Sequence, residues 1–309
     1  MAHIFKFVAA TAAVLAFASP AAAQDVSERA SAFASQVALS ASDTQYARWS
    51  DGLCPSVAGL AAADAQTIID HIARRAHQVG LDVAGAGCSR NLIIIFAPEG
   101  RAVAQELVTT RPDLLGFASA LDIPPSLRPR LDAFVAQDRP VRYWHLSTTM
   151  GADGSSVSDG ETRQGRGTRD ALAASRGGGS DAVLAGNGLS NVEAMRADGT
   201  RFRSATREDI TFAVVVVDTR QVAGQPPSAV ADYVTMASLV QLDPAADLSS
   251  YPSILNLFSG APGAAQTSMT AWDMGYLEGL YRGNNRSAAS LRQQRADIAR
   301  RIQRAVGNQ

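Results

Sequence analysis

The sequence predicts an α+β fold in which helices pack against a mixed sheet. Apolar runs that are typical of buried strands occur near residues 49–57, 91–97, 141–149 and 210–218. Segments with apolar residues at helical spacing stand between and after these runs. Because strands and amphipathic helices must both bury an apolar face, the alternation favours a sheet flanked by helices over a helical bundle or a sandwich.

The N-terminus has the features of a secretory signal peptide over residues 1–23. Lys6 supplies a positive charge, an apolar run follows over 7–18, and Ala21, Ala22 and Ala23 provide a small-residue cleavage site. A membrane span needs about 20 apolar residues, more than this run offers, and a retained signal anchor is the alternative. We therefore expect an exported protein, periplasmic or secreted, with no transmembrane segment in the mature chain.

The remaining chain is organised as one globular α+β domain over 46–309, preceded by a flexible segment over 24–45. The flexible segment is expected because 24–45 is polar and rich in Ala and Ser. Residues 150–200 are rich in Gly, Ser, Asp and Arg, which predicts a long loop, a feature that often carries function. The predicted helices are 62–79, 101–110, 124–137, 226–242, 270–281 and 287–306.

Local signals place the ends of these helices. Gly80 ends the first predicted helix, whose apolar face includes Ile68 and Ile72. Pro124 is expected near the start of the third, because proline is tolerated in a first helical turn. Thr270 is a candidate N-cap, and Asp273 follows in the first turn, where a carboxylate suits the helix dipole.

Cys54 and Cys88 are the two cysteines of the chain. In an exported protein a single pair predicts a disulfide, with two free buried thiols as the alternative. The bond would close a loop of about 34 residues and stabilise the fold by at most roughly 3–4 kcal/mol.

The composition excludes several kinds of chemistry. Lys6 is the sole lysine, so the mature chain has no P-loop lysine, Schiff-base lysine or Ser-x-x-Lys nucleophile. The 28 basic and 29 acidic residues balance, which gives no indication of nucleic-acid binding. No two of the remaining histidines, His71, His77 and His145, are four residues apart, the spacing at which a helix pairs metal ligands. We interpret them as structural or surface residues.

The C-terminal third resembles the metzincin metalloproteases in layout. Those enzymes place a zinc-binding helix after a strand, followed by a Met-containing turn and a closing helix that ends in Leu-Tyr. Here the strand is 213–217 and the helix 226–242, Ser253-Ile254-Leu255 stands at the turn, and 273–281 (DMGYLEGLY) resembles the closing helix. The resemblance implies a zincin-like C-terminal part.

The zinc-binding residues of that family are absent from this alignment. Ala231, Thr235 and Gln241 stand at the three histidine positions, and Asp232 stands at the general-base glutamate. Alanine cannot bind a metal, and Thr and Gln are poor zinc ligands, so the resemblance implies a pseudoenzyme without zinc or another cofactor. Carboxylates alone could hold a hard ion such as calcium, for which Asp153, Asp159 and Glu161 are weak candidates.

Most of 46–300 also resembles a family of exported bacterial proteins that share a domain of unknown function, a resemblance that implies no particular activity. The residues that carry it are Arg48-Trp49, Cys54-Pro55, Gly59-Leu60, Cys88, Asn91-Leu92, Ala231-Asp232-Tyr233, Leu257-Phe258 and Trp272-Asp273.

Two functions remain open at this point. The first is a non-catalytic binding or scaffold protein of the cell envelope, with Asp232, Tyr233 and Thr235 lining a cleft for an envelope protein, a peptide or a glycan. The alternative is a metal-independent hydrolase in which Asp232 acts with a second carboxylate a few ångströms away. The candidates for that partner are Glu208, Asp209 and Asp273.

Overall fold

The computed structural model describes residues 20–40, 45–152, 204, 206–260, 266–282 and 290–308. Residues 1–19 of the predicted signal peptide lie outside the described residues, as does nearly all of the predicted loop at 150–200. The candidate calcium ligands Asp153, Asp159 and Glu161 also lie outside them.

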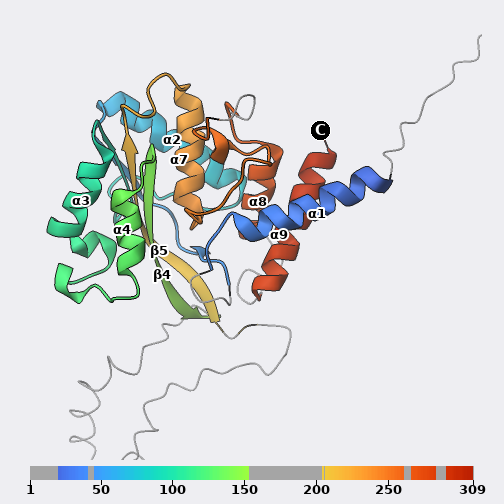
Figure 1. Cartoon of the computed structure of the whole chain (residues 1–309), viewed down its shortest axis with the longest axis horizontal. Coiled ribbons are helices and arrows are strands. Elements are labelled where there is room, and N and C mark those ends of the chain that lie inside the picture. Colours follow the sequence, from blue (N-terminus) through green and yellow to red (C-terminus); the bar gives the residue numbers. More distant parts are fainter. Residues whose placement is uncertain are drawn as a thin grey trace, which may run out of the picture.

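A mixed sheet forms the centre of the fold (Figure 1). Its strands are β1 (Arg48–Trp49), β2 (Pro55–Ala58), β3 (Leu92–Ala97), β4 (Val141–Gly151) and β5 (Thr206–Asp218). The long strand β5 pairs in parallel with β1 and β3 and antiparallel with β4, and β2 extends the sheet beyond β3. The register sets Leu92 opposite Ala213 and Val141 opposite Val217. These strands agree with the four apolar runs of the sequence.

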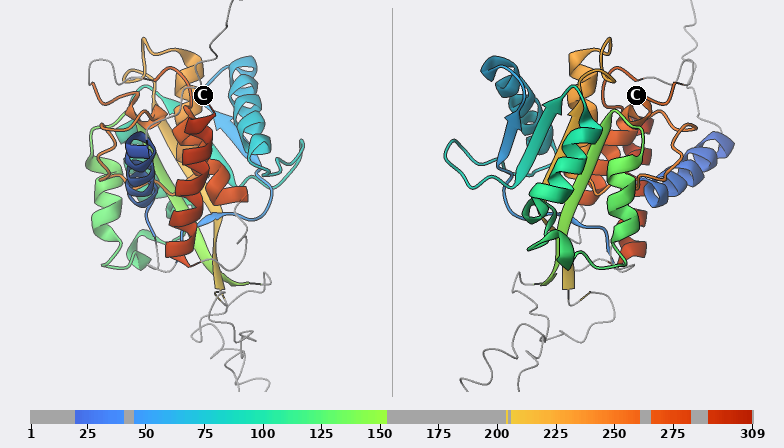
Figure 2. Two further views of the ribbon diagram at one scale, coloured as in Figure 1. Left: turned by 90° about the vertical axis from the view of Figure 1, so that its right-hand side faces the viewer. Right: turned by 60° about the vertical axis from the view of Figure 1, so that its left-hand side comes forward.

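Helices cover both faces of this sheet, which confirms the predicted sheet with flanking helices (Figure 2). The longer helices are α1 (Pro20–Gln36), α2 (Ala62–Gln78), α3 (Gly100–Thr110), α4 (Arg128–Ala136), α7 (Pro227–Leu239), α8 (Ala271–Arg282) and α9 (Leu291–Gly307). Helices α3 and α4 lie on one face of the sheet, and α2 and α7 lie on the other. Helices α8, α9 and α1 pack on the same side as α7.

Strand β5 is buried on both faces because its side chains alternate between two apolar cores. Val214 and Val216 belong to the smaller core under α3 and α4, together with Trp144 of β4. Val215 and Val217 belong to the larger core under α7 and its neighbours. A strand covered on both sides needs an almost continuous apolar run, which explains the sequence Ala213–Val217.

Helices α8 and α9 pack with little space between their backbones because α8 has glycines at the contact. A Cβ atom at Gly275 would lie 2.7 Å from the Cα atom of Ile302, and one at Gly279 would overlap the Cα atom of Ile298. Neither glycine can be replaced without moving α9. Helix α1 then crosses α9 on its outer side (Figures 1 and 2).

Two features differ from the sequence-based expectations. Residues 24–45 were expected to have little regular structure, whereas α1 occupies residues up to Gln36 and fully buries Ala30, Phe33 and Ala34. These residues follow the i, i+3, i+4 spacing of a helix face, which the surrounding Ser and Ala residues obscure. The third helix was expected from Pro124, but α4 begins at Arg128, with Pro129 in its first turn.

The predicted disulfide between Cys54 and Cys88 is confirmed, with the two Cα atoms 6.0 Å apart. It joins the segment before β2 to the segment before β3. Asn91 supports the same junction, because its side chain accepts from the Cys54 amide at 2.7 Å and donates to the Gly52 carbonyl at 3.0 Å. Within the described ranges, none of the helices is long and apolar enough to cross a membrane.

Candidate functional site

Helix α7, which carries the predicted site residues, lies between the sheet and α2. It starts at Pro227 directly after Pro226, where the missing amide hydrogen of proline costs no helical hydrogen bond. Its residues from Ala229 to Leu239 are buried, with the exception of the half-buried Tyr233. A polar side chain on this helix therefore needs a hydrogen-bond partner within the protein.

Asp232 finds its partners on α2 and in the segment before α8. It is 1% exposed, and its Oδ1 atom lies 2.6 Å from Nε2 of His71 and accepts from Nε of Arg75 at 2.8 Å. Its Oδ2 atom accepts from Nη2 of Arg75 at 2.9 Å and from the Met269 amide at 2.8 Å. Both carboxylate oxygens are therefore occupied by donors of the protein itself.

The electrostatic result is a carboxylate that stays ionised. Burial alone would raise the pKa of Asp232, but the hydrogen bonds from His71, Arg75 and the Met269 amide lower the pKa to about 2. A general base or acid at neutral pH needs a pKa near that pH. Asp232 is thus suited to joining α2, α7 and the segment before α8, and poorly suited to proton transfer.

The residues at the histidine positions of the zinc-helix alignment do not form a metal site. Thr235 is fully buried, and its hydroxyl donates to the Ala231 carbonyl at 2.7 Å. Gln241 lies beyond the end of α7, and its buried Oε1 atom has no hydrogen-bond partner in the described part of the chain. In that same part, no group of three or more His, Cys, Asp or Glu residues could hold a metal ion.

Tyr233 is the predicted cleft residue that faces open space. It lines a cavity of about 310 Å³ between α7, the start of β4 and the chain segment 242–259. Tyr143 of β4 and Phe258 line the same cavity, and the rings of Tyr233 and Phe258 stand edge to face with their centroids 4.9 Å apart. Burial raises the pKa of both tyrosines, so their hydroxyls remain protonated at neutral pH.

Charged residues surround the aromatic part of this cavity. They are Asp138, Arg139, Asp243 and Asp247. The Arg139 guanidinium lies 5.9 Å from the Tyr143 ring centroid and donates to the Pro244 carbonyl at 3.3 Å. Neither Asp232 nor Thr235 lines this cavity, so the three residues predicted to share a cleft are divided between a buried ionic cluster and an open cavity.

The turn Ser253-Ile254-Leu255 and the start of α8 are joined by Asp273. The Ser253 hydroxyl donates to Oδ1 of Asp273 at 2.5 Å, and Oδ2 accepts from the amides of Ile254 at 2.9 Å and Thr270 at 2.8 Å. Asp273 is fully buried, and burial raises its pKa despite these donors. Asp273 therefore lies in the first turn of α8, as expected, and also binds the preceding turn at Ser253.

The carboxylates considered as partners for Asp232 are all bound elsewhere. Asp232 and Asp273 accept from consecutive amides, Met269 and Thr270, yet each has its own set of donors. Glu208 and Asp209 lie at the start of β5, where Glu208 accepts from Thr149 at 2.8 Å and Asp209 accepts from Ser50 at 2.7 Å. None of these four described carboxylates, Asp232, Asp273, Glu208 and Asp209, lines the 310 Å³ cavity.

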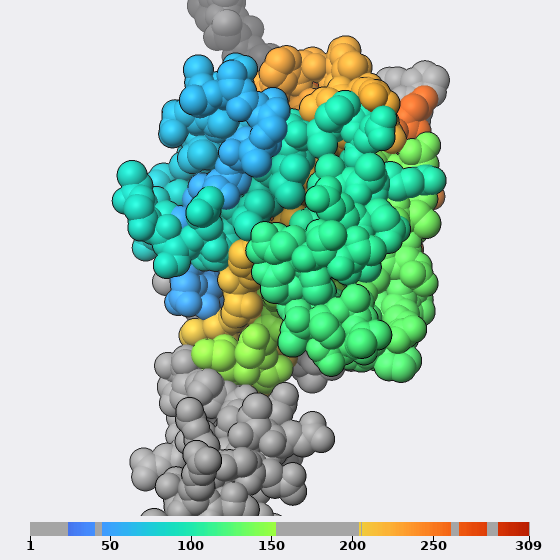
Figure 3. Space-filling model, turned by 90° about the vertical axis from the view of Figure 1, so that its left-hand side faces the viewer, coloured from blue at the N-terminus to red at the C-terminus, as the bar shows by residue number. Residues whose placement is uncertain are grey.

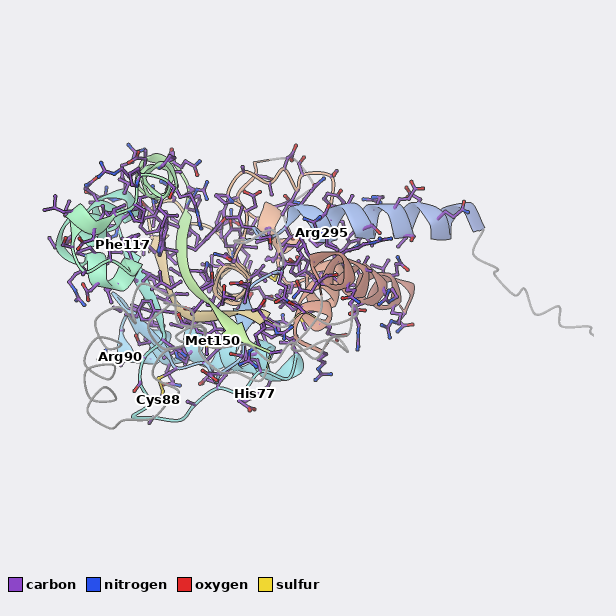
Figure 4. All side chains as sticks on the ribbon, turned by 90° about the horizontal axis from the view of Figure 1, so that it is seen from below. His77, Cys88, Arg90, Phe117, Met150 and Arg295 are labelled. Carbon is purple, nitrogen blue, oxygen red and sulfur yellow. A yellow bond between two sulfur atoms is a disulfide. The ribbon has the colours of Figure 1, made fainter. Side chains whose placement is uncertain are left out.

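The three histidines among the described residues occupy different environments. His71 contacts Asp232, as described above, and His77 lies exposed on α2 (Figure 4). His145 of β4 is buried, and burial lowers its pKa to about 4, so its imidazole is neutral at pH 7. Figure 4 also shows Arg295 beside α1, where its Nε atom donates to the Tyr46 hydroxyl at 2.9 Å.

Sequence reasoning missed His71 and Arg75 as partners of Asp232, and it missed Tyr143 and Phe258 as neighbours of Tyr233. A signal for the first pair was present, because residues four apart lie on one face of a helix. No local signal identified the second pair, which β4 and the segment after α7 bring together. Comparisons with known protein families, with characterised proteins and with solved structures found no match.

Proposed function

We propose that this chain is a non-catalytic binding protein of the cell envelope, and that it binds its ligand in the 310 Å³ cavity beside Tyr233. One observation carries the proposal: of the polar residues expected in the cleft, Tyr233 alone lines an open cavity, whereas Asp232 and Thr235 are bound to other groups of the fold. Export of the chain is part of the proposal, supported by the disulfide and by the signal-like N-terminus.

The arrangement of α7 and α8 supports a zincin-like scaffold without its metal. Helix α7 follows β5, the turn at Ser253 comes next, and Asp273 at the start of α8 binds that turn. Hydrolysis by paired carboxylates has no comparable support, because Asp232 and Asp273 are each surrounded by donors. We therefore favour binding over catalysis for this scaffold.

The cavity suits a ligand that presents a basic side chain. Its charged lining residues are Asp138, Asp243 and Asp247 against Arg139, which gives a local charge of −2 (one positive minus three negative). The rings of Tyr143, Tyr233 and Phe258 supply π faces that attract a cation. A peptide with an exposed Arg or Lys fits this combination better than a neutral glycan, and the volume suits one long side chain.

The test is a binding assay on the purified mature protein. Fluorescence polarisation would compare peptides that carry Arg or Lys with the same peptides carrying Gln, and with neutral oligosaccharides. The variant Asp247→Asn removes one charge while keeping an oxygen that can accept from the Ser249 amide. It should weaken binding of basic peptides about threefold to tenfold at low salt, with a smaller effect at high salt.

Asp51→Asn is the matched control, because Asp51 is exposed and lies outside the cavity lining. It should leave the affinity unchanged. Equal binding of Arg and Gln peptides, or equal losses in the two variants, would contradict the proposed ligand. Turnover of a peptide or an oligosaccharide by the wild type would contradict the non-catalytic part.

A further inference from the structure

A second cavity, of about 580 Å³, lies at the carboxyl ends of β3 and β5. It is bordered by Pro98 after β3, by the start of α3, by Asp218 at the end of β5 and by Gln221 after it. The helix that follows β3 covers one face of the sheet, and the helix that follows β5 covers the other. In open α/β sheets, such a reversal between neighbouring parallel strands leaves a crevice where ligands bind.

Three arginines line this crevice: Arg101, Arg142 and Arg220. The Arg220 side chain is paired with Glu99 at 3.1 Å on the surface. No carboxylate among the described residues lies within ion-pair distance of Arg101 or Arg142. The Arg101 guanidinium instead donates to the Ala136 carbonyl at 2.8 Å. Three carboxylates, Glu99, Asp138 and Asp218, line the crevice as well, so its charged lining residues balance. The guanidinium groups of Arg101 and Arg142 are nevertheless bonded to backbone carbonyls and not to these carboxylates.

Arg142 provides an independent indication of a missing ligand. It is 1% exposed, and its two Nη atoms donate to the carbonyls of Arg139 at 2.8 Å and Gln137 at 2.9 Å. Its buried Nε atom has no hydrogen-bond partner in the part of the chain that the structure describes. A buried, charged donor without an acceptor is costly, and an anion in the crevice would supply that acceptor.

The start of α3 adds further donors at the same place. The Gly100 amide donates to Oδ2 of Asp218 at 2.8 Å. The carboxylate of Asp218 therefore binds the first amide of α3. The amides of Arg101 and Ala102 have no acceptor within the described ranges. Both residues line the crevice, and helix N-termini favour anions. Figure 3 shows this face, with the loop after β5 in orange at its upper edge.

From the unbonded Nε atom of Arg142, the exposed guanidinium of Arg101 and the free amides at the start of α3, we propose that this crevice binds a small organic oxyanion, a carboxylate or a phosphate. Pro98, Ala102 and Val135 form an apolar part of the lining, which suits a ligand with a short carbon skeleton. Its volume lies in the range of small-molecule sites. The crevice shares one lining residue, Asp138, with the cavity beside Tyr233. The test of the crevice does not involve Asp138, so its failure would leave the proposed binding function untouched.

The test is a titration of the isotopically labelled mature protein, followed by NMR. Inorganic phosphate and succinate would be added in separate titrations, with chloride keeping the ionic strength constant. We expect either ligand to shift the amide signals of Arg101 and Ala102 and the Nε–H signal of Arg142. Saturation by phosphate alone or by succinate alone would identify which oxyanion the site prefers, and either result supports the site.

Arg101→Gln should weaken the binding at least about fivefold, since it removes one charged donor at the surface. Arg292→Gln is the matched control, because Arg292 is exposed on α9, away from the crevice, and should leave the affinity unchanged. Gly100→Ala is a second variant, whose Cβ atom would lie 3.0 Å from Nη1 of Arg142 and should also weaken binding. The proposal is overturned if neither ligand shifts these signals, or if Arg101→Gln and Arg292→Gln bind equally.

Discussion

Arg75 binds both oxygens of Asp232, with Nε to Oδ1 at 2.8 Å and Nη2 to Oδ2 at 2.9 Å. The two residues lie on different helices, α2 and α7, and Asp232 also holds the Met269 amide before α8. One carboxylate therefore joins three segments that are far apart in the sequence. Its removal should loosen the packing of α2 on α7, since a charge left without its partner is destabilising.

The first prediction is that Asp232→Asn lowers the free energy of unfolding at pH 7 by about 2–4 kcal/mol. This is below the usual cost of breaking a fully buried pair, because Arg75 is 23% exposed. Urea unfolding would measure the change. Asp51→Asn, which alters an exposed carboxylate, is the control and should have a negligible effect. A loss below about 0.5 kcal/mol in Asp232→Asn would show that the cluster contributes little.

The second prediction concerns acid. The lowered pKa of Asp232, about 2 against an ordinary 3.8, contributes stability that is fully present above pH 4 and is lost as the pH falls toward 2. The size of this contribution is about 2 kcal/mol. Wild-type stability should therefore fall more steeply than that of Asp232→Asn between pH 4 and 2. Parallel curves from urea unfolding at a series of pH values would contradict the role of His71 and Arg75.

The third prediction tests the link between the Ser253 turn and α8. Ser253→Ala removes a donor from the buried Asp273 and should destabilise the protein by about 1–3 kcal/mol. Ser249→Ala is the matched control, because Ser249 is exposed and its hydroxyl bonds only the exposed carboxylate of Asp247, so its loss should have a small effect. Chemical unfolding of both variants provides the comparison. Equal stability of the two would mean that the Ile254 and Thr270 amides suffice for Asp273.

The fourth prediction concerns the disulfide. Mass spectrometry of the unreduced purified protein should show two hydrogens fewer than the reduced form, since Cys54 and Cys88 are bonded. Reduction should lower the free energy of unfolding by at most about 3–4 kcal/mol for the separation of 34 residues. Free thiols after purification without reductant would contradict the pairing.

The fifth prediction is that the protein purifies without stoichiometric zinc and that EDTA leaves its melting temperature unchanged. The physical reason is that Ala231, Thr235 and Gln241 stand where zinc ligands would be required. Elemental analysis and melting curves with and without chelator provide the measurement. One zinc ion per chain, or a clear drop in melting temperature, would reopen the enzymatic alternative.

The strands, the longer helices other than α1, and the disulfide were predictable because their signals are local. Ala213–Val217 is apolar without interruption, as a strand covered on both faces requires, and Gly80 marks the end of α2 with a positive φ of 80°. The pairing of Cys54 with Cys88 followed from there being no other cysteine. Helix α1 was missed because its apolar face is made largely of alanine, which gives little contrast with its polar neighbours.

The sequence by itself determined which residues were available for chemistry: it supplied no lysine beyond Lys6 and no histidines on α7. The tertiary structure decided where those residues point. Asp232 and Tyr233 are neighbours in the chain, but successive residues of a helix are turned by about 100°. Asp232 therefore faces α2 and is buried in an ionic cluster, whereas Tyr233 faces β4 and lines a cavity. That division depends on which elements pack against each side of α7, and no local pattern specifies it.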